Sequence, residues 1–298
     1  MSDPSLLDAS ALGELEALAR RLGARARSGA TGSRIARRRG SSAEFEEHRG
    51  YEPGDDPRRI DWLATARLGR PMVKIFAAEE DVVVRLFVDA SASMAAGGST
   101  KIASARRIAA ALGYLALAGS ERAELVVGRQ NEAMRGRTHR GRGSAARLVR
   151  EIAGFEANGT LDLASALREL LVASKRAGLL VVISDFFDAG PVSRSLSMAR
   201  AAGHDVALIH LLSPEDASPA LEGDCALVDS ETGEVLDVTI DAAVLDAHAA
   251  RLATLESGLR AWAKGHGATY VRGTTEELAT AVVRRVVGLR NDRTGSRA

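Results

Sequence analysis

The sequence predicts an α/β fold: an open, mainly parallel sheet with helices on both faces, preceded by an N-terminal helical and extended segment. From residue 82 onward, short apolar runs alternate with stretches of helical spacing, which is the order of parallel βαβ units. The apolar runs are rich in β-branched residues and almost unbroken, as expected for strands buried on both faces. Two of these runs end in Ser and Asp, so polar side chains are expected at one edge of the sheet.

The elements follow from hydrophobic spacing. Residues 4–27 are expected to form a helix, because Leu and Ala recur there at helical intervals, and the Gly-, Ser- and Arg-rich residues 28–50 are expected to be extended or loop. Strands are expected at residues 82–89, 123–129, 179–184, 205–212 and 268–272. Further helices are expected at residues 101–118, 144–153, 161–177, 190–203, 241–266 and 275–290.

The pattern also predicts how the chain is divided. Turn residues at 229–233 lie between two short apolar runs, which indicates an additional hairpin. We expect residues 1–75 to pack as an N-terminal segment on a main domain of residues 76–290. The polar residues 291–298 are expected to be a frayed tail.

Composition excludes several classes of function. Forty basic and 39 acidic residues leave a net charge of +1, which argues against a general nucleic-acid binder. The arginines at 37–39 are expected to lie in a solvated loop, and those at 135–142 in a solvated hairpin loop. Cys225 is the only cysteine, so no internal disulfide can form. The sequence shows neither a signal-peptide pattern nor an apolar run long enough to span a membrane, and we expect a cytoplasmic protein.

A candidate metal site begins where the strand at 82–89 ends. Asp89, Ser91 and Ser93 form an Asp-x-Ser-x-Ser string with alanines between them. Carboxylate and hydroxyl oxygens are hard donors that suit Mg²⁺, Mn²⁺ or Ca²⁺ better than zinc or copper. Taken alone, the string is more often a loop that caps a helix.

Two later residues strengthen the metal interpretation. Thr160 opens an amphipathic stretch, and Asp185 directly follows the apolar strand at 179–184. Because the carboxyl ends of parallel strands form the binding crevice of open α/β sheets, Asp89 and Asp185 are expected to lie close together. The sequence therefore predicts a metal site made of Asp89, Ser91, Ser93, Thr160 and Asp185.

These five residues resemble the metal-ion-dependent adhesion site of von Willebrand factor A domains, which have a Rossmann-like fold. The resemblance implies that Ser91 and Ser93 bind the metal directly, that Thr160 does so in one conformational state, and that the two aspartates act partly through waters. In adhesive members of that family, a partner's Asp or Glu fills an open coordination position. The resemblance thus implies a protein-binding site rather than a catalytic one.

A second signature precedes this region. Residues 49–62 read Arg-Gly-Tyr-Glu-Pro-Gly-Asp-Asp-Pro-Arg-Arg-Ile-Asp-Trp, followed by Ala66-Arg67, Gly69-Arg70 and Val73-Lys74. This segment is similar to the family called domain of unknown function 58, whose members carry a von Willebrand A-like domain directly after it. Leu63 departs from the Lys that is usual there. The resemblance also implies an adaptor or chaperone-like role beside an AAA+ ATPase of the MoxR class, which is commonly encoded next to such proteins.

The signature segment can also be interpreted locally. Asp56 and Pro57 are expected to start a short helix as its N-cap and first residue. That helix is expected to turn Ile60, Leu63 and Ala64 inward. Asp61, Trp62 and Arg67 are expected to hold the segment against the main domain rather than bind a ligand.

Two alternatives to a metal-dependent binder remain open. Asp89 and the acids after residue 184 partly match haloacid-dehalogenase phosphatases, which use a strand-end Asp as nucleophile. Those enzymes need a second Asp two positions later as general acid, and Ser91 cannot serve in that role. We therefore expect no enzymatic activity. The other alternative is a structural scaffold whose metal site is vacant.

Overall fold

The chain folds into two units. A computed structural model describes residues 6–27, 45–76, 82–96, 100–174, 176–187 and 192–295. Contacts divide the chain into a main unit, Met1–Arg37 with Val82–Ala298, and a small unit, Arg38–Asp81. Helix α1 (Ala9–Arg27) thus belongs to the main unit, whereas the signature residues belong to the small one. The expected segment of residues 1–75 is divided between the two.

The main unit is built on a six-stranded sheet of order β10-β7-β6-β3-β4-β5. All neighbouring strands are parallel except β4 and β5, which pair antiparallel. The strands are β3 (Val83–Asp89), β4 (Arg122–Arg129), β5 (Glu132–Arg140), β6 (Gly178–Ser184), β7 (Asp205–Leu212) and β10 (Thr269–Thr274). This open, mainly parallel sheet confirms the α/β class predicted from the alternating pattern.

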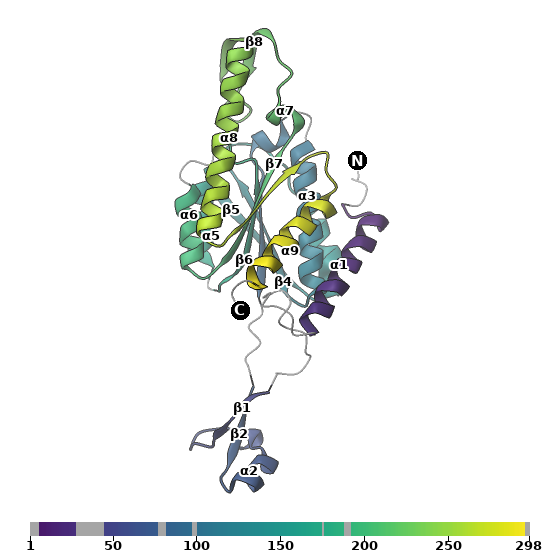
Figure 1. Ribbon diagram of the computed structural model, residues 1–298, viewed down its shortest axis with the longest axis vertical. Coiled ribbons are helices and arrows are strands. Elements are labelled where there is room, and N and C mark those ends of the chain that lie inside the picture. Colours follow the sequence, from purple (N-terminus) through teal and green to yellow (C-terminus); the bar gives the residue numbers. More distant parts are fainter. Residues whose placement is uncertain are drawn as a thin grey trace. The chain divides into compact units, whose positions relative to one another are not determined.

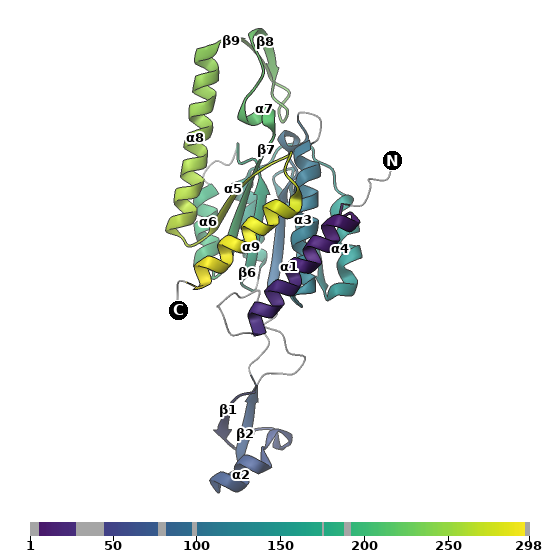
Figure 2. The ribbon, with the colours of Figure 1, turned by 45° about the vertical axis from the view of Figure 1, so that its right-hand side comes forward.

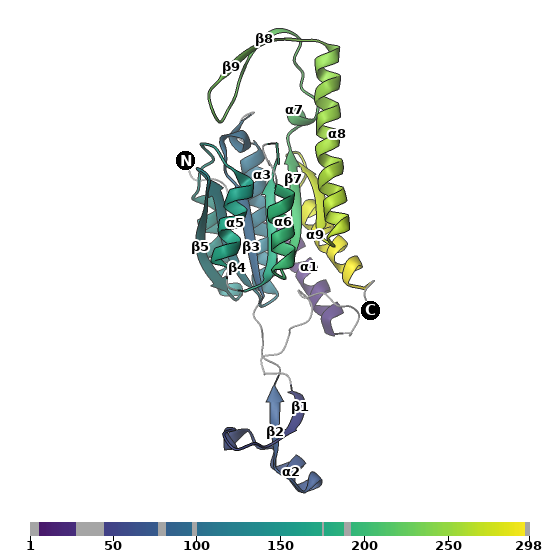
Figure 3. The same ribbon diagram turned by 90° about the vertical axis from the view of Figure 1, so that its left-hand side faces the viewer.

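Helices cover both faces of the sheet (Figures 1 and 3). Besides α1, the helices of the main unit are α3 (Thr100–Ala118), α4 (Ala145–Ala153), α5 (Leu163–Ala173), α6 (Val192–Ala201), the short α7 (Pro214–Ala217), α8 (Ala242–Gly265) and α9 (Ala279–Gly295). Helices α1, α3, α4 and α9 lie on one face, as Figure 2 shows, and α5, α6 and α8 lie on the other. No helix in the described ranges is both apolar enough and long enough to cross a bilayer.

The two faces have separate apolar cores because successive strand residues point in opposite directions. In β3, Leu86 and Val88 join the core on the α3 side, whereas Phe87 joins the core on the α5 side. All seven residues of β3 and all seven of β6 are buried. This explains why both strands have nearly continuous apolar sequences that end in polar residues.

The structure differs from the sequence-based expectation in two places. The Arg-rich stretch at 135–142 was expected to be a solvated hairpin loop. It does belong to a hairpin and is largely exposed, but most of it forms the edge strand β5 rather than a loop. Gln130 and Asn131 join β4 to β5 with positive φ angles of 54° and 62°, as a two-residue hairpin turn requires. The tail expected to fray from residue 291 instead continues α9 to Gly295.

The predicted additional hairpin is present. Strands β8 (Gly223–Val228) and β9 (Val235–Ile240) pair antiparallel and are joined by the turn residues 229–234. Both strands are largely exposed, unlike the central strands of the sheet. Figures 2 and 3 show the hairpin turning back from the start of α8 toward the beginning of α3.

The small unit consists of the antiparallel strands β1 (Phe45–Gly50) and β2 (Met72–Phe76), a 3₁₀ turn at Pro57–Arg59 and helix α2 (Trp62–Leu68). Asp56 caps the 3₁₀ turn as expected, by accepting a hydrogen bond from the Arg58 N–H at 3.0 Å. Asp61 caps α2 and also meets the His48 ring at 2.8 Å. Leu63 was expected to point inward but is 76% exposed, and Trp62 is 70% exposed.

Candidate functional site

The candidate site lies at the carboxyl ends of two adjacent strands, β3 and β6. The strands are parallel and in register, with Val88 opposite Ile183, so Asp89 comes next to Ser184 and Asp185. A small pocket of about 10 Å³ opens there, room for roughly one water-sized sphere. It is lined by Asp89, Ser91, Ser93, Leu161, Leu163, Ser184, Asp185, Phe186 and Glu231. Four of the five predicted residues therefore share one pocket.

Asp89 is at the centre of a network of hydroxyl groups. Its Oδ1 accepts hydrogen bonds from the backbone N–H and the hydroxyl of Ser91, at 2.9 and 2.7 Å. Its Oδ2 accepts the hydroxyl of Ser184 at 2.6 Å, and the Ser91 and Ser93 hydroxyl oxygens lie 2.9 Å apart. Asp89 thereby fixes the loop that presents the two serines predicted to bind a metal.

The environment of Asp89 disfavours its negative charge. Only 5% of the residue is exposed, and burial, reinforced by the nearby charge of Asp185, raises the pKa of Asp89 to about 6. Hydrogen bonds from Ser184 and Ser91 act in the opposite direction but do not cancel the effect. A positive ion in this pocket would stabilise the carboxylate.

Asp185 is paired with a lysine that the sequence interpretation did not assign to the site. Lys101 Nζ lies 2.8 Å from Asp185 Oδ2 and 3.1 Å from Asp216 Oδ2, and Lys101 and Asp185 are each 2% exposed. Burial lowers the pKa of Lys101, but the two aspartates outweigh it and raise the pKa above its usual value. Asp185 Oδ1 accepts the Phe187 N–H at 3.3 Å, and Asp185 also lines the pocket.

The loop of Thr160 adjoins the site through its backbone. The Ala92 N–H donates to the Gly159 carbonyl at 2.8 Å, and the Asn158 N–H donates to the Ala90 carbonyl at 2.9 Å. The neighbouring Leu161, not Thr160, lines the pocket. The loop that contains Thr160 therefore contacts the loop that contains Ser91 and Ser93, as predicted. The Thr160 side chain, however, does not line the pocket.

The loop after β6 has an unusual backbone. Phe186 has a φ of +57°, which is uncommon for a bulky residue, and its N–H donates to the Ser184 hydroxyl at 2.9 Å. Ser184 therefore connects this loop to Asp89.

His210 lies beside the Phe186 ring. Burial lowers the pKa of His210 to about 4, so this imidazole is neutral, and its Nδ1 forms a hydrogen bond with the Tyr270 hydroxyl at 3.0 Å.

The chemistry of the pocket fits a small hard cation. Its donors are serine hydroxyls and carboxylate oxygens, which Mg²⁺, Mn²⁺ and Ca²⁺ prefer. Ser91 and Ser93 would be direct ligands, and Asp89 and Asp185 would hold waters and hydroxyls in place. Nowhere in the described ranges do three or more His, Cys, Asp or Glu residues gather as a metal cluster. An ion here would depend on the serine hydroxyls.

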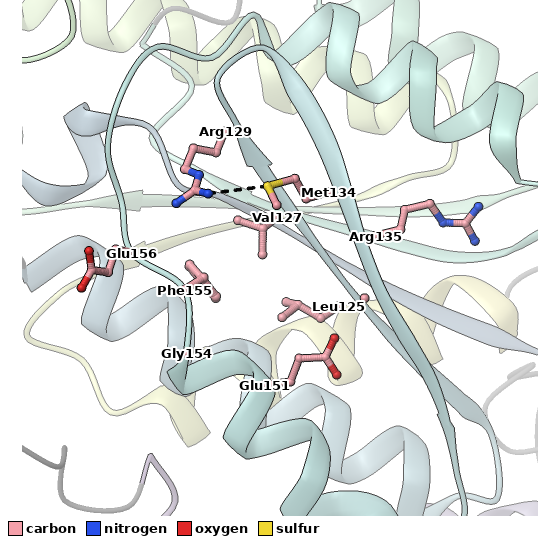
Figure 4. A pocket seen from close by; sticks show the side chains of 10 residues that line it. Leu125, Val127, Arg129, Met134, Arg135, Glu151, Gly154, Phe155 and Glu156 are labelled. Atoms are coloured by element: carbon pink, nitrogen blue, oxygen red, sulfur yellow. Dashed lines mark hydrogen bonds between the residues drawn. The ribbon is translucent and has the colours of Figure 1, made fainter.

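A larger cavity of about 460 Å³ lies between β4, β5 and α4 (Figure 4). Its base is apolar, with Leu125, Val127 and Phe155. Glu151 at its side is already engaged by His139 at 2.7 Å and by the Arg137 N–H at 3.1 Å. None of the five predicted site residues lines it.

The chain has relatives in mycobacteria. Two proteins described as uncharacterized, one from Mycobacterium bovis and one from Mycobacterium tuberculosis, are each 33% identical over 257 residues, covering 84% of this chain and 80% of the relative. An uncharacterized protein of Mycobacterium avium is 41% identical over 86 residues, covering 28% of this chain and 50% of that protein.

Solved structures with some likeness come from Bacteroides. The conserved hypothetical protein BatB from Bacteroides thetaiotaomicron is 16% identical with a TM-score of 0.46, over 70% of this chain and 98% of that one. An aerotolerance-related membrane protein from Bacteroides fragilis is 14% identical with a TM-score of 0.45, over 71% and 99%. These values are too low to support a conclusion about function.

A sequence-family model matches most of the chain. The family model described as "Protein of unknown function DUF58" matches residues 47–257, which include the signature segment, the Asp89 loop and Asp185. This match confirms the resemblance drawn from the residue 49–62 signature, and the chain belongs to the DUF58 family.

Proposed function

We propose that this protein binds a partner protein through a divalent cation held in the pocket at Asp89. The observation that carries the proposal is the convergence of Asp89, Ser91, Ser93 and Asp185 on a pocket with room for one small ion. Mg²⁺ is the favoured ion, with Mn²⁺ or Ca²⁺ as substitutes of similar chemistry.

Each residue would have a distinct role. The Ser91 and Ser93 hydroxyls would hold the ion, and Asp89 orients them through its hydrogen bond to Ser91. Asp185 would order waters in the pocket, and Lys101 donates a hydrogen bond to its Oδ2. When bound, the ion would supply an open coordination position for a carboxylate of the partner. Thr160, in the adjoining loop, would become a ligand only after a shift of that loop.

Two features support binding over phosphoryl transfer. Ser91 stands where a haloacid-dehalogenase phosphatase needs an acid, and both carboxylate oxygens of Asp89 already accept serine hydroxyls. A nucleophilic Asp89 would have to give up these bonds, and no proton donor for the leaving group accompanies it at position 91. We therefore propose a binding protein without enzymatic activity.

The partner and location are proposed on family resemblance alone. A MoxR-type AAA+ ATPase would be the working partner, with this protein acting in the cytoplasm as an adaptor or chaperone-like factor. The chemistry of the pocket adds one requirement, which is an exposed Asp or Glu on the surface that it captures.

Titration calorimetry with Mg²⁺ and Mn²⁺ tests the metal site. Wild type should bind weakly, because hydroxyls and waters supply much of the ligand shell, and Ser91→Ala/Ser93→Ala should lose binding. Ser174→Ala/Ser257→Ala is the matched control, since both of its hydroxyls bond helix carbonyls away from the pocket. Equal binding by the two double variants, or no binding by wild type, would overturn the metal assignment.

A second experiment separates binder, enzyme and scaffold. Wild type and Asp89→Ala are used as bait with and without Mg²⁺, and captured proteins are identified by mass spectrometry. We expect a partner that needs both the ion and Asp89. Metal-dependent hydrolysis of a phosphate monoester that Asp89→Asn abolishes would instead establish the phosphatase. Capture of the same proteins without Mg²⁺ and by Asp89→Ala would show that the interface lies away from the pocket.

A further inference from the structure

The cavity between β4, β5 and α4 has the size of a small-molecule site (Figure 4). Its volume of about 460 Å³ compares with about 10 Å³ for the pocket at Asp89, and the two share no lining residue. Pockets of roughly 300–1,000 Å³ that are mostly apolar, with a few charged groups at defined positions, are typical of ligand sites. This cavity is therefore a candidate site of its own.

The apolar base of the cavity is preformed. Leu125 and Val127 are buried residues of β4, and Phe155 follows the end of α4. Arg106 of α3 holds Phe155 in place, because its guanidinium group lies 4.9 Å from the centre of the Phe155 ring and donates a hydrogen bond to the Phe155 carbonyl. A ligand would thus meet a fixed apolar surface and would lose little free energy in ordering it.

Two of the charged residues that line the cavity are already engaged by other groups. Arg135 pairs with Glu124 at 2.7 Å, and Figure 4 shows its side chain directed away from the apolar base. Glu151 Oε1 accepts the Arg137 N–H at 3.1 Å, and Glu151 Oε2 lies 2.7 Å from His139 Nε2. Neither Arg135 nor Glu151 therefore lacks a partner that a ligand would have to supply.

Arg129 differs from these residues. Its Nη2 contacts the Met134 sulfur at 3.8 Å, which is a weak acceptor, and its buried Nε has no hydrogen-bond partner among the described residues. Figure 4 shows its guanidinium group on the side of the cavity where Met134 and Phe155 lie. Glu156 also lines the cavity, but it is exposed and its carboxylate points away from the apolar base in this view. The cavity thus offers a buried cationic donor beside an apolar surface.

The chemistry of Arg129 favours a carboxylate as its ligand. The Nε and Nη2 protons lie on one edge of the planar guanidinium group, so the two oxygens of a single carboxylate can accept both and replace the weak contact to sulfur. Pairing would also remove the free-energy cost of leaving Nε buried without an acceptor.

We propose that this cavity binds a small apolar carboxylic acid, with its hydrocarbon body on the apolar base and its carboxylate on Arg129. The inference is independent of the proposed function, because it needs neither a metal ion nor the partner protein.

The test compares octanoate with octanol, two probes of equal chain length that differ in charge, by ligand-observed NMR titration of the full chain. We expect wild type to bind octanoate about tenfold more tightly than octanol. Arg129→Gln should weaken octanoate binding by about tenfold and leave octanol binding unchanged. Arg137→Gln is the matched control, since it removes the same charge from an exposed position of β5 that does not line the cavity, and it should bind both probes as wild type does.

A second variant tests the apolar base. Phe155→Ala should weaken the binding of both probes, with circular dichroism as the control for folding. Octanoate should also slow amide hydrogen exchange at residues 154–158 of wild type. If wild type binds neither probe, if the two arginine variants bind octanoate equally, or if Phe155→Ala binds both probes as wild type does, the site is disproved. None of these outcomes bears on metal binding, so the proposed function is tested separately.

Discussion

Lys101 changes the charge balance of the candidate site by pairing with one of its two aspartates. It lies in the first turn of α3, and its ammonium group contacts Asp185 at 2.8 Å inside the protein. A buried carboxylate is costly without a partner, and the Lys101 ammonium group supplies that partner for Asp185 at the end of β6. The pocket therefore contains two different aspartates. Asp185 forms an ion pair with Lys101, whereas burial disfavours the negative charge of Asp89.

Glu121 provides a pH-dependent prediction at the residue scale. It precedes β4, is 6% exposed, and neither carboxyl oxygen has a hydrogen-bond partner among the described residues. Burial raises the pKa of Glu121 from 4.5 to about 8, although the charge of Arg290 opposes this. Between these two values the native state holds a proton that the unfolded chain releases. The free energy of unfolding should therefore fall as pH rises from 4.5 through 8.

Glu121→Gln should remove this dependence. The variant should be more stable than wild type at pH 8.5, by on the order of 1–4 kcal/mol, and the difference should shrink toward pH 4.5. Urea unfolding at several pH values measures it, with the exposed Glu276→Gln as control. Parallel pH profiles for wild type and Glu121→Gln would contradict the assignment.

At the scale of elements, hydrophobic spacing predicted the buried strands well and the edge strand poorly. Strand β7 begins and ends at the predicted residues, because both of its faces are buried and its sequence is apolar apart from Asp205 and His210. In β5 only Ala133 and His139 are buried, so its Arg-rich sequence resembles a loop. An edge strand is held by backbone pairing on one side, and charged side chains there prevent further pairing.

Gly178 provides a prediction for strand β6. A Cβ atom at this position would lie 2.2 Å from the Val83 carbonyl oxygen, a backbone atom of the adjacent strand that cannot move aside. Gly178→Ala should therefore lower the free energy of unfolding by roughly 1–3 kcal/mol. The matched control is Gly258→Ala in α8, where nothing lies within 4 Å and alanine should stabilise the helix by roughly 0.5–1 kcal/mol. Urea denaturation of both variants decides it, and equal effects would contradict the steric argument.

At the scale of the whole molecule, the N-terminal helix completes the core that the last helix helps to form. Leu15 of α1 is 1% exposed within the core on the α3 and α9 side of the sheet. At the surface, Arg284 of α9 meets Glu14 at 2.6 Å, and Tyr114 of α3 donates to Glu16 at 3.2 Å. The main unit is therefore built from both ends of the chain.

Leu15→Ala should destabilise the main unit by about 2–4 kcal/mol, because it leaves a cavity between α1 and the helices beneath it. Val172→Ala serves as the control, since Val172 is 85% exposed and its truncation should change stability by less than about 0.5 kcal/mol. Thermal and urea unfolding give the measurement. A Leu15→Ala variant as stable as wild type would show that α1 does not contribute to the core.

The sequence by itself determined the fold class, most of the helices and strands, and the meeting of Asp89 and Asp185 at one edge of the sheet. Strands that are buried on both faces have continuous apolar sequences, and the polar residues that follow them mark the edge where the strands end. The signature at residues 49–62 likewise determined the family. Only the tertiary structure decided which other groups meet at that edge. Lys101 and Glu231 reach the pocket from a helix start and a hairpin turn, and neither position carries a local pattern that distinguishes it from surface. Contacts between residues far apart in sequence depend on how elements pack, which hydrophobic periodicity does not encode.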